Sequence, residues 1–225
     1  MRIGILGGSF NPVHKDHVKI ASTIIDKLAL DKMLILPNAT PPHKNSCHLD
    51  FKTRLKLLKL SGFSKLEHIE FSTLEQDESV CHYSIDTLKI LKQTYKDDKL
   101  YFCMGQDSLN YLDKWHQGLN LIDYANLVVV GRCGYDLSKA NPQVLEFLKT
   151  YRLDEHSPDF LNKFNSNCNY CITLDCTFNL ISSSMLRDAF LKYFDNNDQS
   201  ALALIEDNLD KEVFNYILEN HIYKK

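Results

Sequence analysis

The 225-residue chain lacks a strong excess of either charge, an apolar run long enough to span a membrane, and any low-complexity tract. Its formal net charge is -3, so we expect no binding of nucleic acid through general basicity. The first residues do not form a basic segment followed by an apolar stretch, which favours a cytoplasmic protein without a membrane partner. The expected ligand is therefore a small molecule.

Cysteine is present, but in the pattern of neither a disulfide framework nor a complete metal site. The seven cysteines are an odd number and are scattered, as is usual for reduced thiols. Cys168 and Cys171 have ligand-like spacing, Cys176 follows them, and His156 is isolated upstream. A structural zinc site needs four ligands, so we expect no protein-bound metal here.

Apolar strands alternate with amphipathic helices along the chain. This alternation predicts a doubly wound, Rossmann-like α/β fold, a parallel sheet flanked by helices, in a single domain over residues 1–225. After a strand at the start, strands are expected at 33–36, 69–71, 100–104, 127–130 and 172–174, and helices at 51–60, 83–95, 144–153, 183–193 and 211–220. The first helix buries the apolar residues Ile20, Ala21, Ile24, Ile25 and Leu28. The segment 134–169 is expected to be an irregular insertion over the core.

Two glycines, Gly7 and Gly8, end the first predicted strand, and the helix after it carries His14 and His17. Because glycine has no Cβ, backbone N–H groups there can close on a phosphate. The helix start directs its free N–H groups and the positive end of its dipole at the same anion. The two imidazoles share one helical face and can donate hydrogen bonds to phosphate oxygens; if charged, they would also stabilise a phosphoryl-type transition state. The segment is therefore predicted to bind phosphate.

A second helix start carries Ser182, Ser183 and Arg187. Hydroxyl and N–H groups at a helix start suit an anion, and a planar, permanent cation suits bidentate contacts with phosphate. Taken alone, this segment favours a serine cap with a surface arginine. Together with the glycine segment it favours a polyphosphate site.

The string GGSFNPVHKDH, from Gly7 to His17, resembles the GGSFNPVHxGH signature of the nucleotidyltransferases related to class I aminoacyl-tRNA synthetases, and within them the bacterial nicotinate mononucleotide adenylyltransferases. ISSSMLR, ending at Arg187, resembles that family's ISSTxIR motif, and PPHK, ending at Lys44, matches its PPH(K/R) loop. The resemblance covers nearly the whole chain and thins between residues 134 and 169. Further similar segments are Tyr83–Leu88, Met104–Leu109 with Trp115 after it, and Val130–Tyr135.

The resemblance implies a role for each matching residue. The catalytic residues would be His14, His17 and Arg187. ATP would be bound by Gly7, Gly8, Ser9, Phe10, Gly105, Asp107, Arg132, Ser182 and Ser183. Nicotinate mononucleotide would be bound by Asn38, His43, Lys44, Tyr83, Ser84 and Trp115, with the tryptophan stacking on the pyridine ring.

The chain departs from the family pattern at Asp16, where the family has glycine. A carboxylate facing the nucleotide would repel phosphate or crowd the adenine. An acidic residue in the first turn of a helix is also an ordinary feature that the helix dipole favours. We favour the second interpretation.

The implied reaction is transfer of AMP from ATP to nicotinate mononucleotide, giving deamido-NAD and pyrophosphate with Mg²⁺ held mainly through the ATP phosphates. No protein nucleophile is needed, since the enzyme positions the substrates and stabilises charge. Three alternatives stay open: another adenylyl or cytidylyl transferase such as the pantetheine-phosphate enzyme, a non-catalytic nucleotide sensor, and a metal-dependent hydrolase using His14, His17 and His43. The oligomeric state, including a homo-oligomer, is also open.

Overall fold

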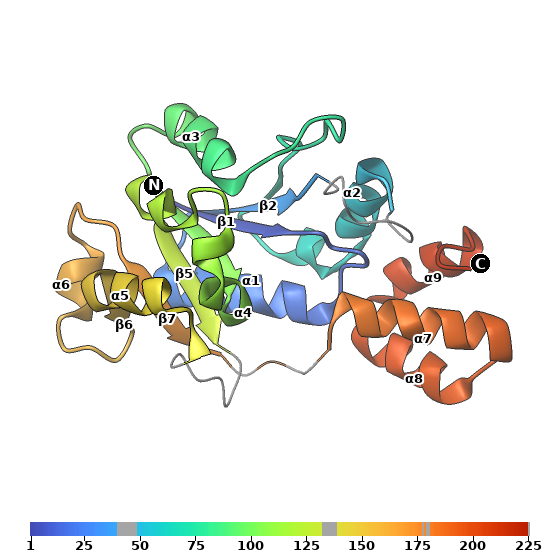
Figure 1. Ribbon diagram of the computed structural model, residues 1–225. Helices are drawn as coiled ribbons and strands as arrows, with labels where there is room; N and C mark the ends of the chain where they lie inside the picture. The colour runs from blue at the N-terminus through green and yellow to red at the C-terminus, as the bar shows by residue number, and fades with distance from the viewer. Residues whose placement is uncertain (40–48, 132–138, 177, 179–180, 225) are drawn as a thin grey trace. The chain divides into compact units, whose positions relative to one another are not determined.

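The computed structural model of the protein describes residues 1–39, 49–131, 139–176, 178 and 181–224. The strands in this part are β1 (Arg2–Gly8), β2 (Lys32–Pro37), β3 (Ile69–Phe71), β4 (Lys99–Gly105), β5 (Asn126–Gly131), β6 (Arg152–Asp154) and β7 (Cys171–Asp175). These seven described strands form one sheet in the order β3-β2-β1-β4-β5-β7-β6 (Figure 1). The pairs β1–β4, β4–β5, β5–β7 and β6–β7 are parallel.

Helices connect the strands and continue beyond them. The α-helices are α1 (Lys15–Leu28), α2 (Phe51–Leu60), α3 (Ser84–Thr94), α4 (Gln106–Asn110), α5 (Pro142–Tyr151), α6 (Phe160–Phe164), α7 (Ser183–Asn196), α8 (Gln199–Asn208) and α9 (Lys211–Glu219). Three short 3₁₀ helices are η1 (Gly62–Lys65), η2 (Leu112–Lys114) and η3 (Gly118–Asp123). No helix among the described residues has the length and apolar character needed to cross a membrane.

The chain divides into two compact units, each assembled from separated segments. Unit 1 comprises Met1–Gly7, Thr23–Ile35 and His82–Phe178. Unit 2 comprises Gly8–Ser22, Leu36–Cys81 and Asn179–Lys225.

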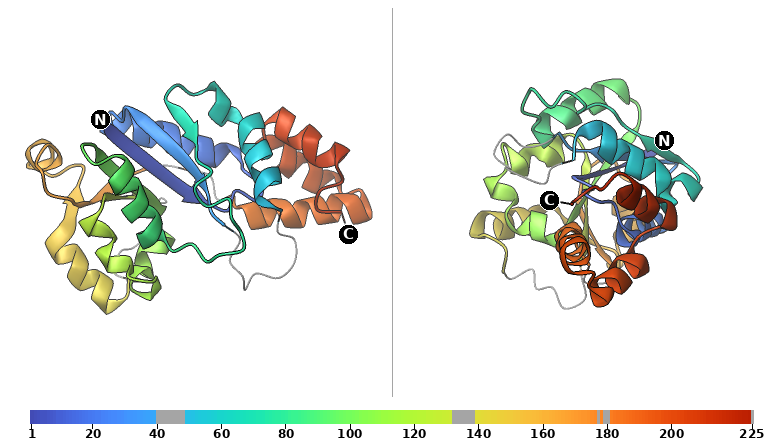
Figure 2. Two further views of the ribbon diagram at one scale, coloured as in Figure 1. Left: turned by 90° about the horizontal axis from the view of Figure 1, so that it is seen from above. Right: turned by 90° about the vertical axis from the view of Figure 1, so that its right-hand side faces the viewer.

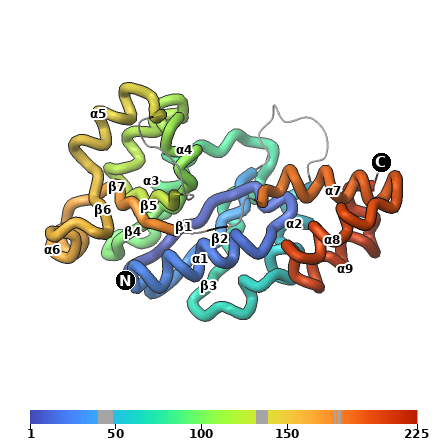
Figure 3. The backbone as a smooth tube through the Cα atoms, turned by 90° about the horizontal axis from the view of Figure 1, so that it is seen from below, coloured from blue at the N-terminus to red at the C-terminus, as the bar shows by residue number. Residues whose placement is uncertain are grey.

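Unit 1 is built on parallel strands that are buried along most of their length. Ile5 of β1 pairs with Phe102 of β4, which pairs with Leu127 of β5, which pairs with Cys171 of β7. Strands buried on both faces are continuously apolar rather than alternating, as β5 shows with Leu127, Val128 and Val129 at 2 % exposure or less. Figure 3 shows α5 and α6 beside β6 and β7.

Unit 2 contains a helical core. Phe63, Phe190, Ile205 and Ile217, from η1, α7, α8 and α9, are fully buried. The last three helices, orange to red in Figure 2, lie together next to α2. Polar contacts reinforce this packing: the Gly62 backbone N–H donates to Asp210 Oδ2 at 2.8 Å.

Most predicted elements are confirmed, because each is either an apolar run or a capped amphipathic segment. The helix predicted at 51–60 is α2, and Asp50 caps it by accepting a hydrogen bond from the Thr53 backbone N–H at 2.6 Å. In α1, Ala21, Ile24 and Leu28 are buried as expected. Ile20 and Ile25 of the same predicted face are only partly buried.

The segment 134–169, predicted to be an irregular insertion with one helix, is more regular than expected in its described part. This segment supplies α5, α6 and the edge strand β6, whose Leu153 pairs with Ile172 of β7. The helix expected to reach Leu153 ends at Tyr151. Leu153 is the one apolar residue of β6, so the segment shows no apolar run, and β6 is defined by its pairing with β7. The helix α8, capped by Asp198, was not predicted.

Candidate active site

The loop after β1 is shaped by close contacts within unit 2. Phe10 has a positive φ of 46° and is buried. A Cβ on Gly8 would lie 3.1 Å from its ring, so glycine permits the approach of the ring to the backbone. The Gly8 carbonyl accepts a hydrogen bond from the Asn38 backbone N–H at 2.9 Å. The end of β1 is thereby tied to the segment that follows β2.

The two histidines lie together at the start of α1. Their ring centroids are 3.7 Å apart, and the His14 backbone N–H donates to His17 Nδ1 at 3.2 Å. Since Nδ1 accepts this bond, the neutral His17 ring carries its proton on Nε2. Burial, followed by repulsion from His14, holds the pKa of His17 well below its ordinary value. The structure thus favours a neutral imidazole that donates a hydrogen bond through Nε2.

The start of α7 is hydrogen-bonded to this same loop. Ser183 Oγ donates to the Pro12 carbonyl at 2.9 Å, and Arg187 Nη1 donates to the Asn11 carbonyl at 2.7 Å. Arg187 Nη2 also donates to Ser184 Oγ at 2.9 Å. Ser182 serves as the helix cap, accepting from the Met185 backbone N–H at 3.2 Å. The two predicted phosphate segments, about 170 residues apart in sequence, are therefore neighbours in unit 2.

The carboxyl-terminal segment reaches the loop as well. Tyr223 is 9 % exposed, and its hydroxyl donates to Asn11 Oδ1 at 2.6 Å. Asn11 therefore accepts from Arg187 through its carbonyl and from Tyr223 through its side chain. We did not predict either role, since no local sequence pattern links residues so far apart.

Unit 1 carries a second group of the predicted residues. Gly105 ends β4, and a Cβ there would displace the exposed Asp107 carboxylate from its observed position. Tyr83 and Ser84 lie at the start of α3, and the helix has no side-chain cap there. The Tyr83 ring lies 4.4 Å from that of His116, the residue after the half-buried Trp115. Gly118 closes this turn, since its Cβ would overlap the Leu112 carbonyl.

Comparisons with known proteins decide the family. A model of cytidylyltransferase-like proteins matches residues 5–189. A relative from Shewanella baltica (strain OS185), described as a probable nicotinate-nucleotide adenylyltransferase, is 34% identical over 193 residues, covering 85% of this chain and 89% of the relative. The chain belongs to the nicotinate-nucleotide adenylyltransferase family.

A further relative agrees with this family, and two solved structures share the fold. A relative of the same description from Shewanella sp. (strain ANA-3) is 40% identical over 147 residues, 63% of this chain and 66% of that relative, so the match spans just under two thirds of its length. A solved structure of Plasmodium falciparum nicotinic acid mononucleotide adenylyltransferase complexed with NaAD has a TM-score of 0.73, covering 99% of this chain and 97% of that chain at 18% identity. The same parasite protein complexed with APC gives 0.70. The predicted Rossmann-like fold is confirmed.

The position where this family member departs from the signature is buried. Asp16 lies in the first turn of α1, as the favoured interpretation expects, and it is only 4 % exposed. Its carboxylate therefore does not decorate a solvated surface. Burial of a charged group is costly unless it is compensated, and the positive end of the α1 dipole acts at this turn.

Three predicted site residues lie outside the described residues: His43, Lys44 and Arg132. Their assignments stay predictions.

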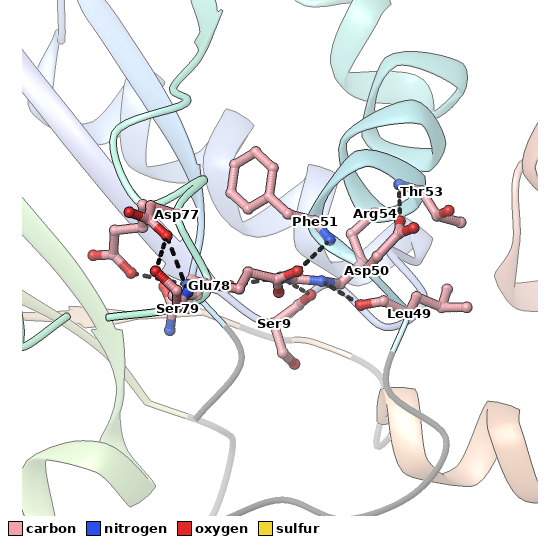
Figure 4. A network of polar contacts seen from close by, with 12 residues as sticks. Ser9, Leu49, Asp50, Phe51, Thr53, Arg54, Asp77, Glu78 and Ser79 are labelled. Carbon is pink, nitrogen blue, oxygen red and sulfur yellow. Dashed lines mark hydrogen bonds and ion pairs between the residues drawn. The ribbon is translucent and has the colours of Figure 1, made fainter. Parts of the chain in front are cut away.

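Sequence reasoning missed one residue that the structure places at the centre of a polar network, Arg54 (Figure 4). This arginine of α2 is 1 % exposed. Its guanidinium donates to the carbonyls of Ser9, Asn38 and Leu49 and to the carboxylate of Glu78. A signal was present, because Arg54 lies one turn before Leu57 and Leu58 on the buried face of α2.

One group of described side chains has the arrangement of metal ligands: Glu155, His156 and Asp175, with ligand atoms within 4.8 Å of one another. Glu155 already pairs with Lys27 at 2.6 Å, and His156 Nε2 lies 3.2 Å from Asp175 Oδ2. These contacts account for the group as an ion-pair network, so we assign no metal to it. The cysteines of the predicted half-site are not members of this group: Cys168, Cys171 and Cys176.

Proposed function

We propose that this chain transfers AMP from ATP to nicotinate mononucleotide, forming deamido-NAD and pyrophosphate. The observation that carries the proposal is the union, in unit 2, of the histidine pair with the serine and arginine start of α7. Two helix starts, a guanidinium and two imidazoles at one loop form a site for a polyphosphate. Membership in the nicotinate-nucleotide adenylyltransferase family supplies the choice of substrates.

The reaction needs no protein nucleophile. The 5′-phosphate oxygen of the mononucleotide forms a bond to the α-phosphorus of ATP, and the bond from that phosphorus to the pyrophosphate oxygen breaks. The protein contributes position and charge stabilisation. We assign the Nε2–H of His17 to an α-phosphate oxygen, His14 to the same phosphate region, and Arg187 to the leaving pyrophosphate.

Mg²⁺ fits this site as a companion of the substrate. The loop and the two helix starts offer imidazoles, hydroxyls and N–H groups, whereas Mg²⁺ prefers oxygen ligands and keeps several waters. The described residues provide no cluster of carboxylates beside the histidine pair. Mg²⁺ would therefore be held by the ATP phosphates, where it neutralises charge.

The mononucleotide is assigned to Tyr83, Ser84 and Trp115, with Asn38, His43 and Lys44 from the segment after β2. The uncapped start of α3 is suited to a carboxylate, and the exposed aromatic pair beside Trp115 is suited to a planar ring.

Residues 1–225 are proposed to act as one nucleotidyltransferase domain in the cytoplasm, on small molecules and without nucleic acid. Gly105, Asp107 and Arg132 are assigned to the ATP nucleoside.

The test is pyrophosphate release from ATP with three acceptors supplied separately: nicotinate mononucleotide, nicotinamide mononucleotide and 4′-phosphopantetheine. We expect release with nicotinate mononucleotide. Faster release with phosphopantetheine would favour another transferase of the family. Tight ATP binding without release for any acceptor would favour a nucleotide sensor.

A further inference from the structure

Arg54 connects two loops that the proposed function assigns to different substrates. Its Nη1 donates both to the Ser9 carbonyl at 3.1 Å and to the Asn38 carbonyl at 2.7 Å. Ser9 belongs to the glycine loop assigned to ATP, and Asn38 begins the segment assigned to the mononucleotide. A single buried nitrogen thus sets the spacing between the two backbones.

The rest of the guanidinium is held just as firmly. Nε donates to the Leu49 carbonyl at 3.0 Å, and Nη2 donates to Glu78 Oε1 at 2.9 Å. The other oxygen of Glu78 accepts from the Phe51 backbone N–H at 3.1 Å. Figure 4 shows the Glu78 carboxylate reaching toward Phe51 and Arg54 at the start of α2. The arginine side chain is therefore fixed at both ends of its planar fork.

This arrangement requires arginine rather than a generic cation. The guanidinium presents five N–H donors in a rigid plane, whereas lysine offers three donors at one point on a flexible stem. A lysine ammonium at this position could reach one or two of the acceptors but not all four in their observed places. Stability alone does not explain the choice, since apolar side chains of similar volume often replace buried ion pairs at no cost.

We propose that Arg54 is a positioning residue for the adenylyl transfer, and that Glu78 orients it. Arg54 holds the carbonyls of Ser9 and Asn38, two residues assigned to different substrates, at a fixed separation. It touches neither substrate. The inference rests on the proposed function for the identity of the substrates but not for the link between the loops.

The decisive comparison is between Arg54→Lys and Leu58→Ala. Leu58 is a fully buried residue of the same helix, so its truncation disturbs α2 without removing the link between the loops. Both variants are measured at a temperature where circular dichroism shows each to be folded. We expect Arg54→Lys to lower kcat/KM for ATP and for nicotinate mononucleotide by tenfold or more, and Leu58→Ala to change either value less than threefold.

A second variant guards against failure of Arg54→Lys to fold. Glu78→Gln keeps the size of the side chain but replaces one acceptor oxygen by an NH₂ donor, so Arg54 and Phe51 can no longer donate to separate oxygens. We expect it to lower both kcat/KM values, as Arg54→Lys does. Since Glu78 acts through Arg54, the fold loss in kcat/KM of the Arg54→Lys/Glu78→Gln double variant should be smaller than the product of the two single fold losses. Multiplicative losses, or equal kinetics in Arg54→Lys and Leu58→Ala, would overturn the proposal.

Calorimetric binding of ATP and of nicotinate mononucleotide separates this inference from the proposed function. If the wild type binds both ligands without turnover, and Arg54→Lys weakens the affinity for each ligand tenfold or more, the transferase activity is refuted and the positioning role of Arg54 is retained. Normal turnover with unchanged binding in Arg54→Lys would keep the transferase and refute the positioning role.

Discussion

At the scale of single residues, the site depends on how neighbours set the state of each side chain. His17 accepts a hydrogen bond on Nδ1 from the His14 backbone, lies edge-on to the Phe10 ring at 5.0 Å, and has a lowered pKa. A neutral donor with a defined tautomer is pre-organised for a phosphate oxygen. His17 then stabilises developing charge through a hydrogen bond, and the Arg187 guanidinium supplies the positive charge at the site.

The lowered pKa of His17 predicts how stability depends on pH. Its folded pKa lies below the unfolded value of about 6.5, so the unfolded chain binds the proton more readily. The contribution of neutral His17 to the free energy of unfolding is therefore fully present above about pH 7. It is lost as the pH falls through 6.5 toward the folded pKa. His17→Asn keeps an acceptor for the His14 N–H but does not titrate. Urea unfolding should therefore show a smaller loss of stability between pH 7.5 and 5.5 in the variant than in the wild type; equal losses would contradict the assignment.

Asp16 gives a second prediction at this scale. Asp16→Gly restores the family residue, removes a favourable dipole contact and adds a glycine to a helix. We expect it to lower the free energy of unfolding by about 1 kcal/mol and to leave the KM for ATP within twofold. Asp16→Asn is the matched control that removes the charge while keeping the size. A KM for ATP that falls several-fold in both variants would show that the carboxylate faces the nucleotide.

At the scale of elements, the sequence was informative wherever the signal was local. The cap Asp50 at the start of α2 and the apolar run of β5 are predictable, because a helix cap and a buried strand are each determined by consecutive residues. The edge strand β6 could not, because its identity depends on pairing with β7. The periodicity of α2 indicates that Arg54 is buried, but its partners Ser9 and Glu78 could not be predicted, because they are 45 and 24 residues away.

The bond between Tyr223 and Asn11 tests how elements support the loop. Tyr223→Phe removes one buried hydrogen bond, which should lower the free energy of unfolding by about 1–3 kcal/mol and raise the KM for ATP, because Asn11 is also held by Arg187. Tyr216→Phe, in α9, is the matched control. Urea unfolding and steady-state kinetics measure both effects. If Tyr223→Phe matched the control in both, the tail would have no part in holding the loop.

At the scale of the whole molecule, the residues assigned to phosphate chemistry come from segments that are distant in sequence. The loop 8–14, the segment around Asn38, α2 and the start of α7 all belong to unit 2, and hydrogen bonds join them there. The predicted motifs could be read one at a time from the sequence, and their convergence in unit 2 is what the fold adds. The assignment of an adenylyl transfer depends on that convergence.

The most direct test of this claim is pyrophosphate release from ATP and nicotinate mononucleotide by the wild type, His17→Ala and Arg187→Ala. We expect turnover in the wild type and a kcat lower by roughly 10²-fold in each variant, with a much smaller rise in KM, because both groups are assigned to charge that develops in the transition state. Near-normal kcat in either variant would remove that residue from the catalytic assignment. Absence of turnover in a wild type that binds both ligands would contradict the account as a whole.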